Sequence, residues 1–311
     1  MRKPRTVFFL LLPLAAVTLL VLAACACVLA QSLGWVPAFG LEEITFSYYL
    51  DILRDEDFLR SLAVSLGVAA GSALLAAVLG TAVCAALTVR GRSGGLITYV
   101  LRLPILVPHA VVALFTILIF SQTGLLARLA CALGLISDFT QFPQLLYTPG
   151  YEGAVAAYLW KEVPFVAYFT LALMSGVSGT LGEAAEDLGA PPLRSFFSVT
   201  LPLSLPAVCR ATLIIFIFAF GGYELPMLLG ATLPKALPVE AYLAYMSPEL
   251  RDRPYALAMY GVILVLSVAL AGLSPLLTPR RRRRIGANLS QSWVYQVASL
   301  GRARSFPLSR R

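Results

Sequence analysis

The stretch Glu183-Ala-Ala-Glu-Asp-Leu-Gly189, followed after nine residues by Val199-Thr-Leu-Pro202, decides how this chain folds. It is charged and contains several turn-forming residues, and it lies between two long apolar segments. Each apolar segment is long enough to cross a lipid bilayer, which takes about 20 residues. The stretch is therefore expected to be a structured connection between two membrane helices.

The residue types in this connection predict a helix, a turn and a second helix. We expect Thr180 to cap a short helix, because Glu183 three residues later completes a capping box. Gly189 permits the left-handed conformation that ends a helix. Pro192 is suited to the first turn of a second short helix over 192–200. The connection is thus expected to be rigid.

The composition indicates a membrane protein. Of the 311 residues, 59% are hydrophobic and only 13% are charged, whereas a soluble domain carries about 25% charged residues. The formal net charge of +8 would be compatible with nucleic-acid binding, but the basic residues lie at the ends of apolar runs. Basic residues at such positions set membrane topology, so nucleic acid is not an expected partner and the lipid bilayer is.

Long apolar windows with little or no charge predict an all-α polytopic protein with six transmembrane helices. The expected spans are 7–30, 61–89, 98–121, 155–178, 207–230 and 255–278. With the N-terminus inside, 17 of the 24 Lys and Arg residues fall in inner segments. The positive-inside rule therefore places both termini, and the 183–202 connection, in the cytoplasm.

The same residues resemble a known family. The spacing of Glu183, Ala184, Ala185, Gly189 and Leu201-Pro202 is similar to the EAA loop of the permease subunits of type I bacterial ABC importers, and Val199 stands where the family has Ile. The resemblance implies that family's six-helix fold and a place in the inner membrane of a bacterium. It also implies that Glu183 meets a basic or polar partner, that Ala184, Ala185 and Gly189 fit a groove on an ATPase subunit, and that Pro202 marks re-entry into the membrane.

The resemblance further implies which partners and cofactors to expect. ABC ATPase subunits would carry ATP and Mg, a second permease subunit, identical or homologous, would complete the pathway, and an extracytoplasmic solute-binding protein would deliver the solute. The chain has three lysines, none of which follows a glycine, so it contains no P-loop. We expect no catalytic residue, no metal site and no bound cofactor, since the five cysteines and the single histidine lack ligand spacing.

The resemblance extends to two further stretches. Trp160-Lys-Glu-Val-Pro-Phe165 is similar to the Trp-x-x-x-Pro-Phe pattern that opens the corresponding helix of the family. Gly222-Tyr-Glu-Leu-Pro226, with Leu229-Gly230 and 237–242, resembles the spermidine/putrescine-type branch and so suggests the substrate. Glu224 and Tyr223 suit a cationic solute through charge and cation–π attraction, so both residues, with Trp160, are expected to line the substrate pathway. Alternatively, Glu224 lies at the outer interface or pairs with the partner permease. Thiamine-like, ferric and anionic solutes remain open.

The expected organisation has three parts. Residues 1–59 form an N-terminal helix and outer loop, 60–278 the core permease domain with its coupling loop at 179–206, and 279–311 a basic cytoplasmic tail. We expect an uncleaved first helix, although Cys25 and Ala30 each lie at a signal-peptidase-like site. A secondary transporter would show charges in several spans and inverted repeats, and a non-catalytic scaffold would leave the EAA spacing unexplained.

Overall fold

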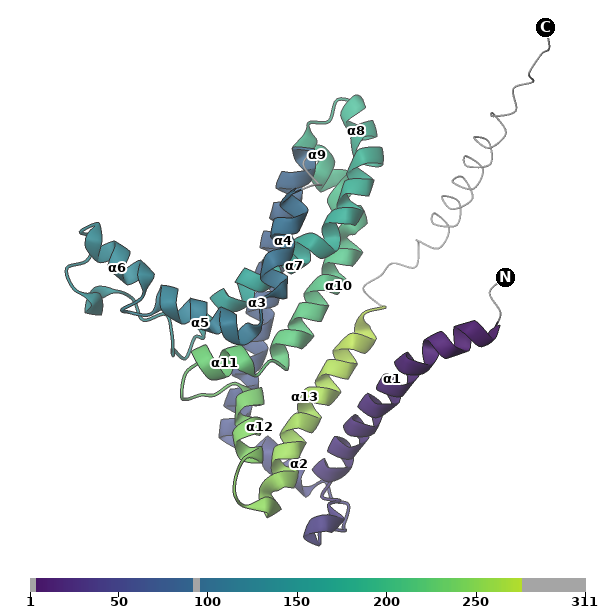
Figure 1. The fold of residues 1–311 in the computed structure, drawn as a ribbon, viewed down its shortest axis with the longest axis vertical. Helices are drawn as coiled ribbons and strands as arrows, with labels where there is room; N and C mark the ends of the chain where they lie inside the picture. The colour runs from purple at the N-terminus through teal and green to yellow at the C-terminus, as the bar shows by residue number, and fades with distance from the viewer. Residues whose placement is uncertain (1–3, 92–95, 276–311) are drawn as a thin grey trace. The chain divides into compact units, whose positions relative to one another are not determined.

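The computed structural model describes residues 4–91 and 96–275. Within these stretches the regular elements are helical, apart from one isolated β-bridge between Val36 and Leu41. The α-helices are α1 (Pro4–Ser32), α2 (Ser47–Arg54), α3 (Glu56–Val89), α4 (Leu96–Leu106), α5 (His109–Phe120), α6 (Leu125–Ala132), α7 (Glu152–Val177), α8 (Glu183–Asp187), α9 (Pro192–Ser195), α10 (Leu201–Phe220), α11 (Glu224–Leu229), α12 (Leu237–Tyr245) and α13 (Arg253–Leu273). The predicted all-α fold is confirmed (Figure 1).

Six helical stretches of the described residues are long and apolar enough to cross a membrane. Their bounds are Leu11–Ser32, Glu56–Val89, His109–Ala132, Glu152–Asp187, Pro192–Phe220 and Arg253–Leu273. The predicted number of spans is confirmed. The bounds of the third and the fifth span differ from the prediction, and both differences shape the candidate site.

The third span was predicted as one helix over 98–121, which is wrong. α4 ends at Leu106 and α5 begins at His109, with Pro108 in an extended conformation as the N-cap of α5. Proline lacks the N–H that a continuing helix needs, and it disfavours helical geometry at the preceding residue. The break at Val107 leaves that residue's backbone carbonyl available to a side chain.

The fifth span was predicted at 207–230, and this too is wrong. α10 ends at Phe220, and the short helix α11 starts only at Glu224. The sequence analysis counted uncharged residues and gave no weight to Gly221 and Gly222, which favour a helix end. The helix therefore breaks directly before Tyr223, which precedes the first residue of α11.

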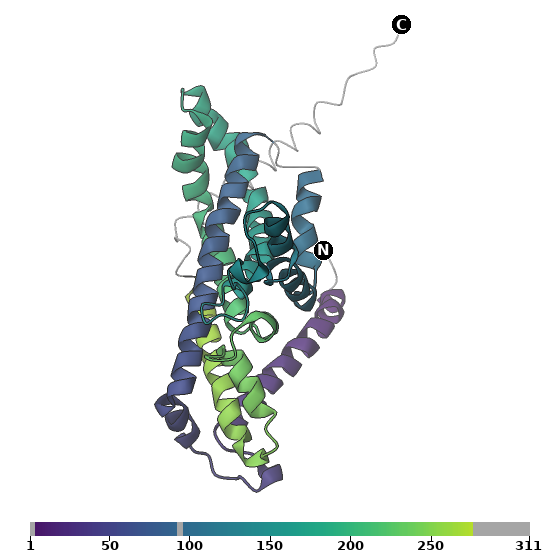
Figure 2. The same ribbon diagram turned by 90° about the vertical axis from the view of Figure 1, so that its left-hand side faces the viewer.

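The core of the bundle is α3 packed along α7 and α10 (Figures 1 and 2). The contact is close because α3 presents small side chains, including Ala73 and Ala76, to Val166 on α7. A Cβ added at Gly80 would lie 2.7 Å from the Cβ of Val166. Small residues that let backbones approach are the usual means of helix packing in membranes. Cys84 belongs to the same packing, and its Sγ donates to the carbonyl of Ala167 at 3.3 Å.

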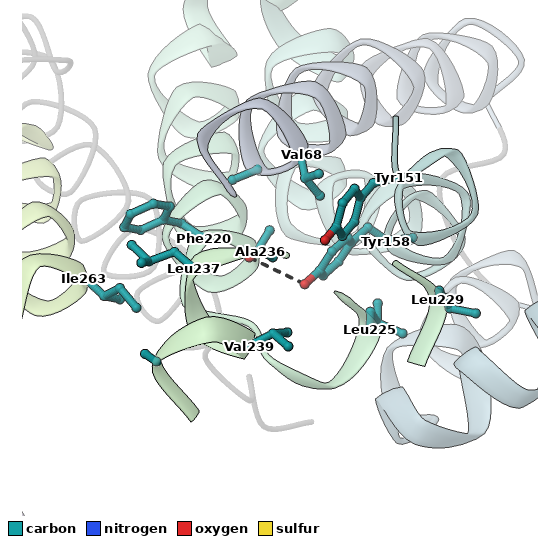
Figure 3. Close-up of a cluster of buried hydrophobic side chains, with 14 of the residues drawn as sticks. Val68, Tyr151, Tyr158, Phe220, Leu225, Leu229, Ala236, Leu237, Val239 and Ile263 are labelled. Carbon is teal, nitrogen blue, oxygen red and sulfur yellow. Dashed lines mark hydrogen bonds between the residues drawn. The ribbon is translucent and has the colours of Figure 1, made fainter. Parts of the chain in front are cut away.

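A second buried cluster packs α11 and α12, which are too short to cross a membrane, against the start of α7 (Figure 3). Tyr151 and Tyr158 lie in its centre beside Leu225 and Leu229. The Tyr151 hydroxyl donates to the carbonyl of Pro234 at 2.9 Å. The segment after α10 is therefore fixed in place and carries Tyr223 and Glu224 to a defined position.

The chain divides into two units, residues 1–272 and 273–311. All the elements considered below belong to the first unit. The basic run at 280–284 and the rest of the expected tail lie outside the described residues, as do Arg2, Lys3 and Arg92.

Candidate functional site

The hairpin that carries the EAA-like residues starts as a continuation of α7. A π-helical turn, η3 (Ser178–Gly182), joins α7 directly to α8. Thr180 is inside this continuous helix, and its hydroxyl donates to the carbonyl of Gly176 at 2.9 Å. The expectation that Thr180 caps a new helix is wrong, because the preceding helix does not end there and the N–H of Glu183 donates to helical carbonyls.

The turn of the hairpin follows the prediction at Gly189. Gly189 has φ +92°, its N–H donates to the carbonyl of Glu186 at 2.8 Å, and the N–H of Ala190 donates to that of Ala185 at 3.1 Å. These two bonds form a Schellman motif, which satisfies the last carbonyls of α8. α9 then begins at Pro192, as predicted, and a second π-helical turn, η4 (Phe196–Thr200), leads into α10.

The two arms of the hairpin are joined at their base by small polar side chains. The Ser195 hydroxyl donates to the carbonyl of Gly182 at 3.0 Å, and both residues are buried. A Cβ added at Gly182 would lie 3.3 Å from the hydroxyl oxygens of Ser178 and Ser195. A side chain of the second arm therefore contacts the backbone of the first arm. The segment beyond this contact projects as a rigid unit.

The part beyond this contact, residues 183–194, is here called the hairpin tip. Glu183, Ala184, Gly189 and the later Pro202 are exposed, and Ala185 is half-buried. Leu188 is 91% exposed at the turn. Leu193 in the tip and Phe197 just after it are also exposed. A rigid tip that shows acidic and large apolar side chains together has the composition of a protein-docking surface.

A second group of functional candidates lies where α5, α7 and α11 meet. Lys161 on α7 donates from Nζ to the carbonyl of Val107 at 2.7 Å, and the same Nζ lies 3.4 Å from Nδ1 of His109. Nδ1 of His109 is 3.9 Å from Oε2 of Glu224. The side chain of Glu224 is 57% exposed. We call His109, Lys161, Glu162 and Glu224 the polar cluster.

Glu162 is the buried member of the polar cluster, with a relative exposure of 6%. Neither of its carboxylate oxygens has a hydrogen-bond partner among the described residues. It lines a cavity of about 310 Å³ together with Ile105, His109, Lys161, Phe165, Ile214, Ile215 and Phe218. An adjoining cavity of about 270 Å³ shares His109 and Phe218 and includes Tyr158, Tyr223 and Glu224. The polar cluster thus connects two hollows.

The structure brings Tyr223 and Glu224 together but places Trp160 elsewhere. Tyr223 packs on the ring of Tyr242 with centroids 4.7 Å apart. Trp160 instead lines an apolar hollow with Val112, Phe115 and Pro164, on another side of α7. Each residue of an α-helix adds a rotation of about 100°, so Trp160 and Glu162, two residues apart, project about 200° from each other on nearly opposite sides of α7.

The sequence analysis missed Glu162, Lys161 and His109 as a group. Lys161 and Glu162 were named only as part of the stretch 160–165, and the single histidine, His109, was considered only for its lack of metal-ligand spacing. The available signal was the pair of charges inside an otherwise uncharged span, since intramembrane charges are rare and usually face a cavity or a partner. Their meeting with His109 depends on the break at Pro108.

The chain and its fold match known proteins. Residues 73–283 match the family model described as binding-protein-dependent transport system inner membrane component, which is more than half of the chain. The chain belongs to this family. It is therefore a permease subunit of an ABC importer, a multi-pass inner-membrane protein in a family of transport components. The matched residues include the hairpin tip and the polar cluster.

Individual relatives of this permease differ in what they transport. The putrescine transport system permease protein PotI of Escherichia coli (strain K12) is 27% identical over 70% of this chain and 71% of its own length. The molybdate/tungstate transport system permease protein WtpB of Pyrococcus abyssi (strain GE5 / Orsay) is also 27% identical, over 76% of this chain and 86% of its own. The crystal structure of a bacterial ABC transporter involved in alginate import has a TM-score of 0.67 at 19% identity, covering 88% of this chain and 96% of that one, and shares the fold.

Proposed function

We propose that this permease is driven by a separate ATPase subunit that binds the hairpin tip. The observation that supports this most directly is the exposure of Leu188 at a turn that the Gly189 Schellman motif holds rigid. Glu183, Ala184 and Ala185 lie on α8 beside it and would contact the ATPase, and Pro202 would begin the return into the membrane. A stiff tip transmits a displacement of its partner to α7 and α10, which switches access to the pathway.

The remaining parts of the transporter follow from this role. A second permease subunit, identical or homologous, would complete the pathway, and a solute-binding protein outside the membrane would deliver the solute. ATP and Mg would be held by the ATPase, so this chain would bind no cofactor and catalyse no reaction itself. Both termini and the hairpin tip would face the cytoplasm, as the basic residues indicate.

The proposed substrate is a polyamine-type organic cation. The polar cluster supports this, because Glu162 and Glu224 supply carboxylates to the two adjoining hollows. The ring of Tyr223 beside Glu224 would add cation–π attraction. The putrescine permease among the relatives agrees with a cation, whereas the molybdate/tungstate permease shows that the family also serves anions.

The test of ATPase binding is a pull-down of the full chain in detergent from cells that express the whole transporter. Wild type should retain an ATPase, and Leu188→Asp and Glu183→Arg should each lose most of it. Leu135→Asp is the matched control, because Leu135 is also an exposed leucine but lies after α6, far along the chain from the hairpin tip. If Leu188→Asp retained as much ATPase as the control, the tip would not be the docking element.

A further inference from the structure

The cavity beside Glu162 contains a buried carboxylate whose charge is not balanced by direct contact. Lys161 is adjacent in sequence, but its ammonium donates to the carbonyl of Val107 at 2.7 Å. His109 lies near the ammonium of Lys161 and near Glu224, at 3.4 and 3.9 Å. The cationic groups on this side of α7 are therefore engaged away from the Glu162 oxygens, which have no hydrogen-bond partner in the described part of the chain.

A buried carboxylate without a partner is strongly disfavoured, whereas one paired with a cation and hydrogen-bonded is tolerated. An apolar side chain of similar size, such as leucine, would occupy the position of Glu162 without this penalty. Glu162 is instead one of the residues that line a cavity of about 310 Å³, between residues of α4, α5, α7 and α10, and its carboxylate oxygens are buried beside it. An occupant that brings an N–H donor and a positive charge would remove the penalty.

The other walls of the cavity limit the chemistry of that occupant. Ile105, Ile214 and Ile215 are aliphatic, and Phe165 and Phe218 offer aromatic faces. Metal cations such as Mg²⁺ and Ca²⁺ take about six or more oxygen ligands, and Mg²⁺ in addition releases its water reluctantly. An alkylammonium group needs one carboxylate for its charge, and its carbon chain gains from burial against apolar walls.

We propose that this cavity binds the protonated amine of an alkylammonium solute, with Glu162 as its counter-ion and the carbon chain against Phe165 and Phe218. The inference rests on the proposed importer function and deepens it, because it assigns the inner charge contact to Glu162. Glu224, which is far more exposed, meets the solute first in the adjoining hollow. His109 and Phe218 line both hollows. The amine therefore moves from the hollow beside Glu224 to the cavity beside Glu162 past these two side chains.

The experiment measures binding of radiolabelled 1,4-diaminobutane to the full chain in lipid nanodiscs, alone and with its ATPase. Glu162→Gln keeps the shape of the side chain and removes its charge, so affinity should fall at least about tenfold, the effect of losing one hydrogen bond to a charged group. Glu42→Gln is the matched control, because Glu42 is an exposed carboxylate between α1 and α2, outside both the hairpin tip and the polar cluster. It should bind like wild type. Unlabelled 1,4-butanediol, which has the same length without charge, should not compete.

Several results would overturn the inference. Binding by Glu162→Gln within twofold of wild type would show that the carboxylate does not hold the amine. Absence of diamine binding to a wild-type chain that retains its ATPase, or competition by molybdate, would reject the alkylammonium site while leaving the importer function intact. Loss of the ATPase from wild type would instead reject the proposed function, and the binding measurement on the chain alone would still decide the cavity.

Discussion

The hydroxyl of Tyr255 on α13 donates a hydrogen bond to the carboxylate of Asp55, which stands 200 residues earlier at the start of α3. Asp55 is also the N-cap of α3, because its Oδ1 accepts from the N–H of Asp57 at 2.9 Å. One carboxylate thus fixes the beginning of the longest helix and joins it to the last one. This position is expected to respond to pH.

The hydrogen bond from Tyr255 holds the pKa of Asp55 below its ordinary value. A carboxyl group with a lowered folded pKa contributes stability that is fully present above its unfolded pKa and is lost as the pH falls through the folded pKa. Asp55→Asn keeps a good N-cap, so the advantage of wild type over it should be constant above about pH 5 and shrink below about pH 4. Thermal unfolding in detergent between pH 7 and pH 3 measures this. A difference that stayed constant down to pH 3 would contradict it.

Gly189→Ala should lower the stability of the hairpin tip by straining its backbone, without any steric clash of the new side chain. A Cβ at Gly189 meets nothing within 4 Å, but the residue has φ +92°, where an L side chain is strained. We expect a loss of about 1 kcal/mol of stability and reduced retention of the ATPase. Gly176→Ala is the control, since Gly176 in α7 also has open space around it and has helical geometry. Equal effects of the two substitutions in unfolding and pull-down measurements would rule out the conformational explanation.

The contribution of the contact between the hairpin arms to stability can be measured by replacing two serines, Ser195 and Ser204, separately. Ser195→Ala removes the donor to the Gly182 carbonyl and should lower the free energy of unfolding by about 1 kcal/mol. Ser204→Ala should be neutral or stabilising, because the buried Ser204 hydroxyl has no hydrogen-bond partner among the described residues. Chemical unfolding of both variants gives the comparison. A greater loss for Ser204→Ala than for Ser195→Ala would mean that the arms are held differently.

Gly222 lies against Tyr158, and we expect the two positions to be coupled. A Cβ added at Gly222 would be 2.5 Å from the Tyr158 hydroxyl oxygen. Gly222→Ala should therefore destabilise the chain by about 1–3 kcal/mol, the usual range for overpacking. Adding Tyr158→Phe, which removes that oxygen, should recover part of the loss. A double-mutant cycle by thermal unfolding measures the coupling, and strict additivity would show that the two groups do not meet.

The fold class and the turn of the hairpin could be predicted from the sequence, whereas the polar cluster could not. Counting uncharged windows identified six spans because the energetic penalty for charge in a bilayer is large. The turn at Gly189 and the start of α9 at Pro192 were predictable because their geometry is local. Glu162 was not, since its burial depends on α4 and α10, which are distant in sequence. The helix breaks at Pro108 and Gly221 could have been predicted locally, because proline and glycine favour helix ends, but a count of charged residues does not consider these residue types.

The two π-helical turns at the base of the hairpin, η3 and η4, set the direction in which its tip faces. A π-helical turn holds one residue more than an α-helical turn, and each residue of an α-helix adds about 100° of rotation. If η3 became α-helical without any change in sequence length, Glu183 and Leu188 would rotate by about that angle relative to α7. Deleting one residue from 178–182 at the same time would leave their direction almost unchanged, because the π-helical turn takes up its extra residue within itself. The two π-helical turns can thus be understood as an angular setting for the hairpin tip. They determine which way the face that we propose for docking points, while residues 183–194 supply its side chains.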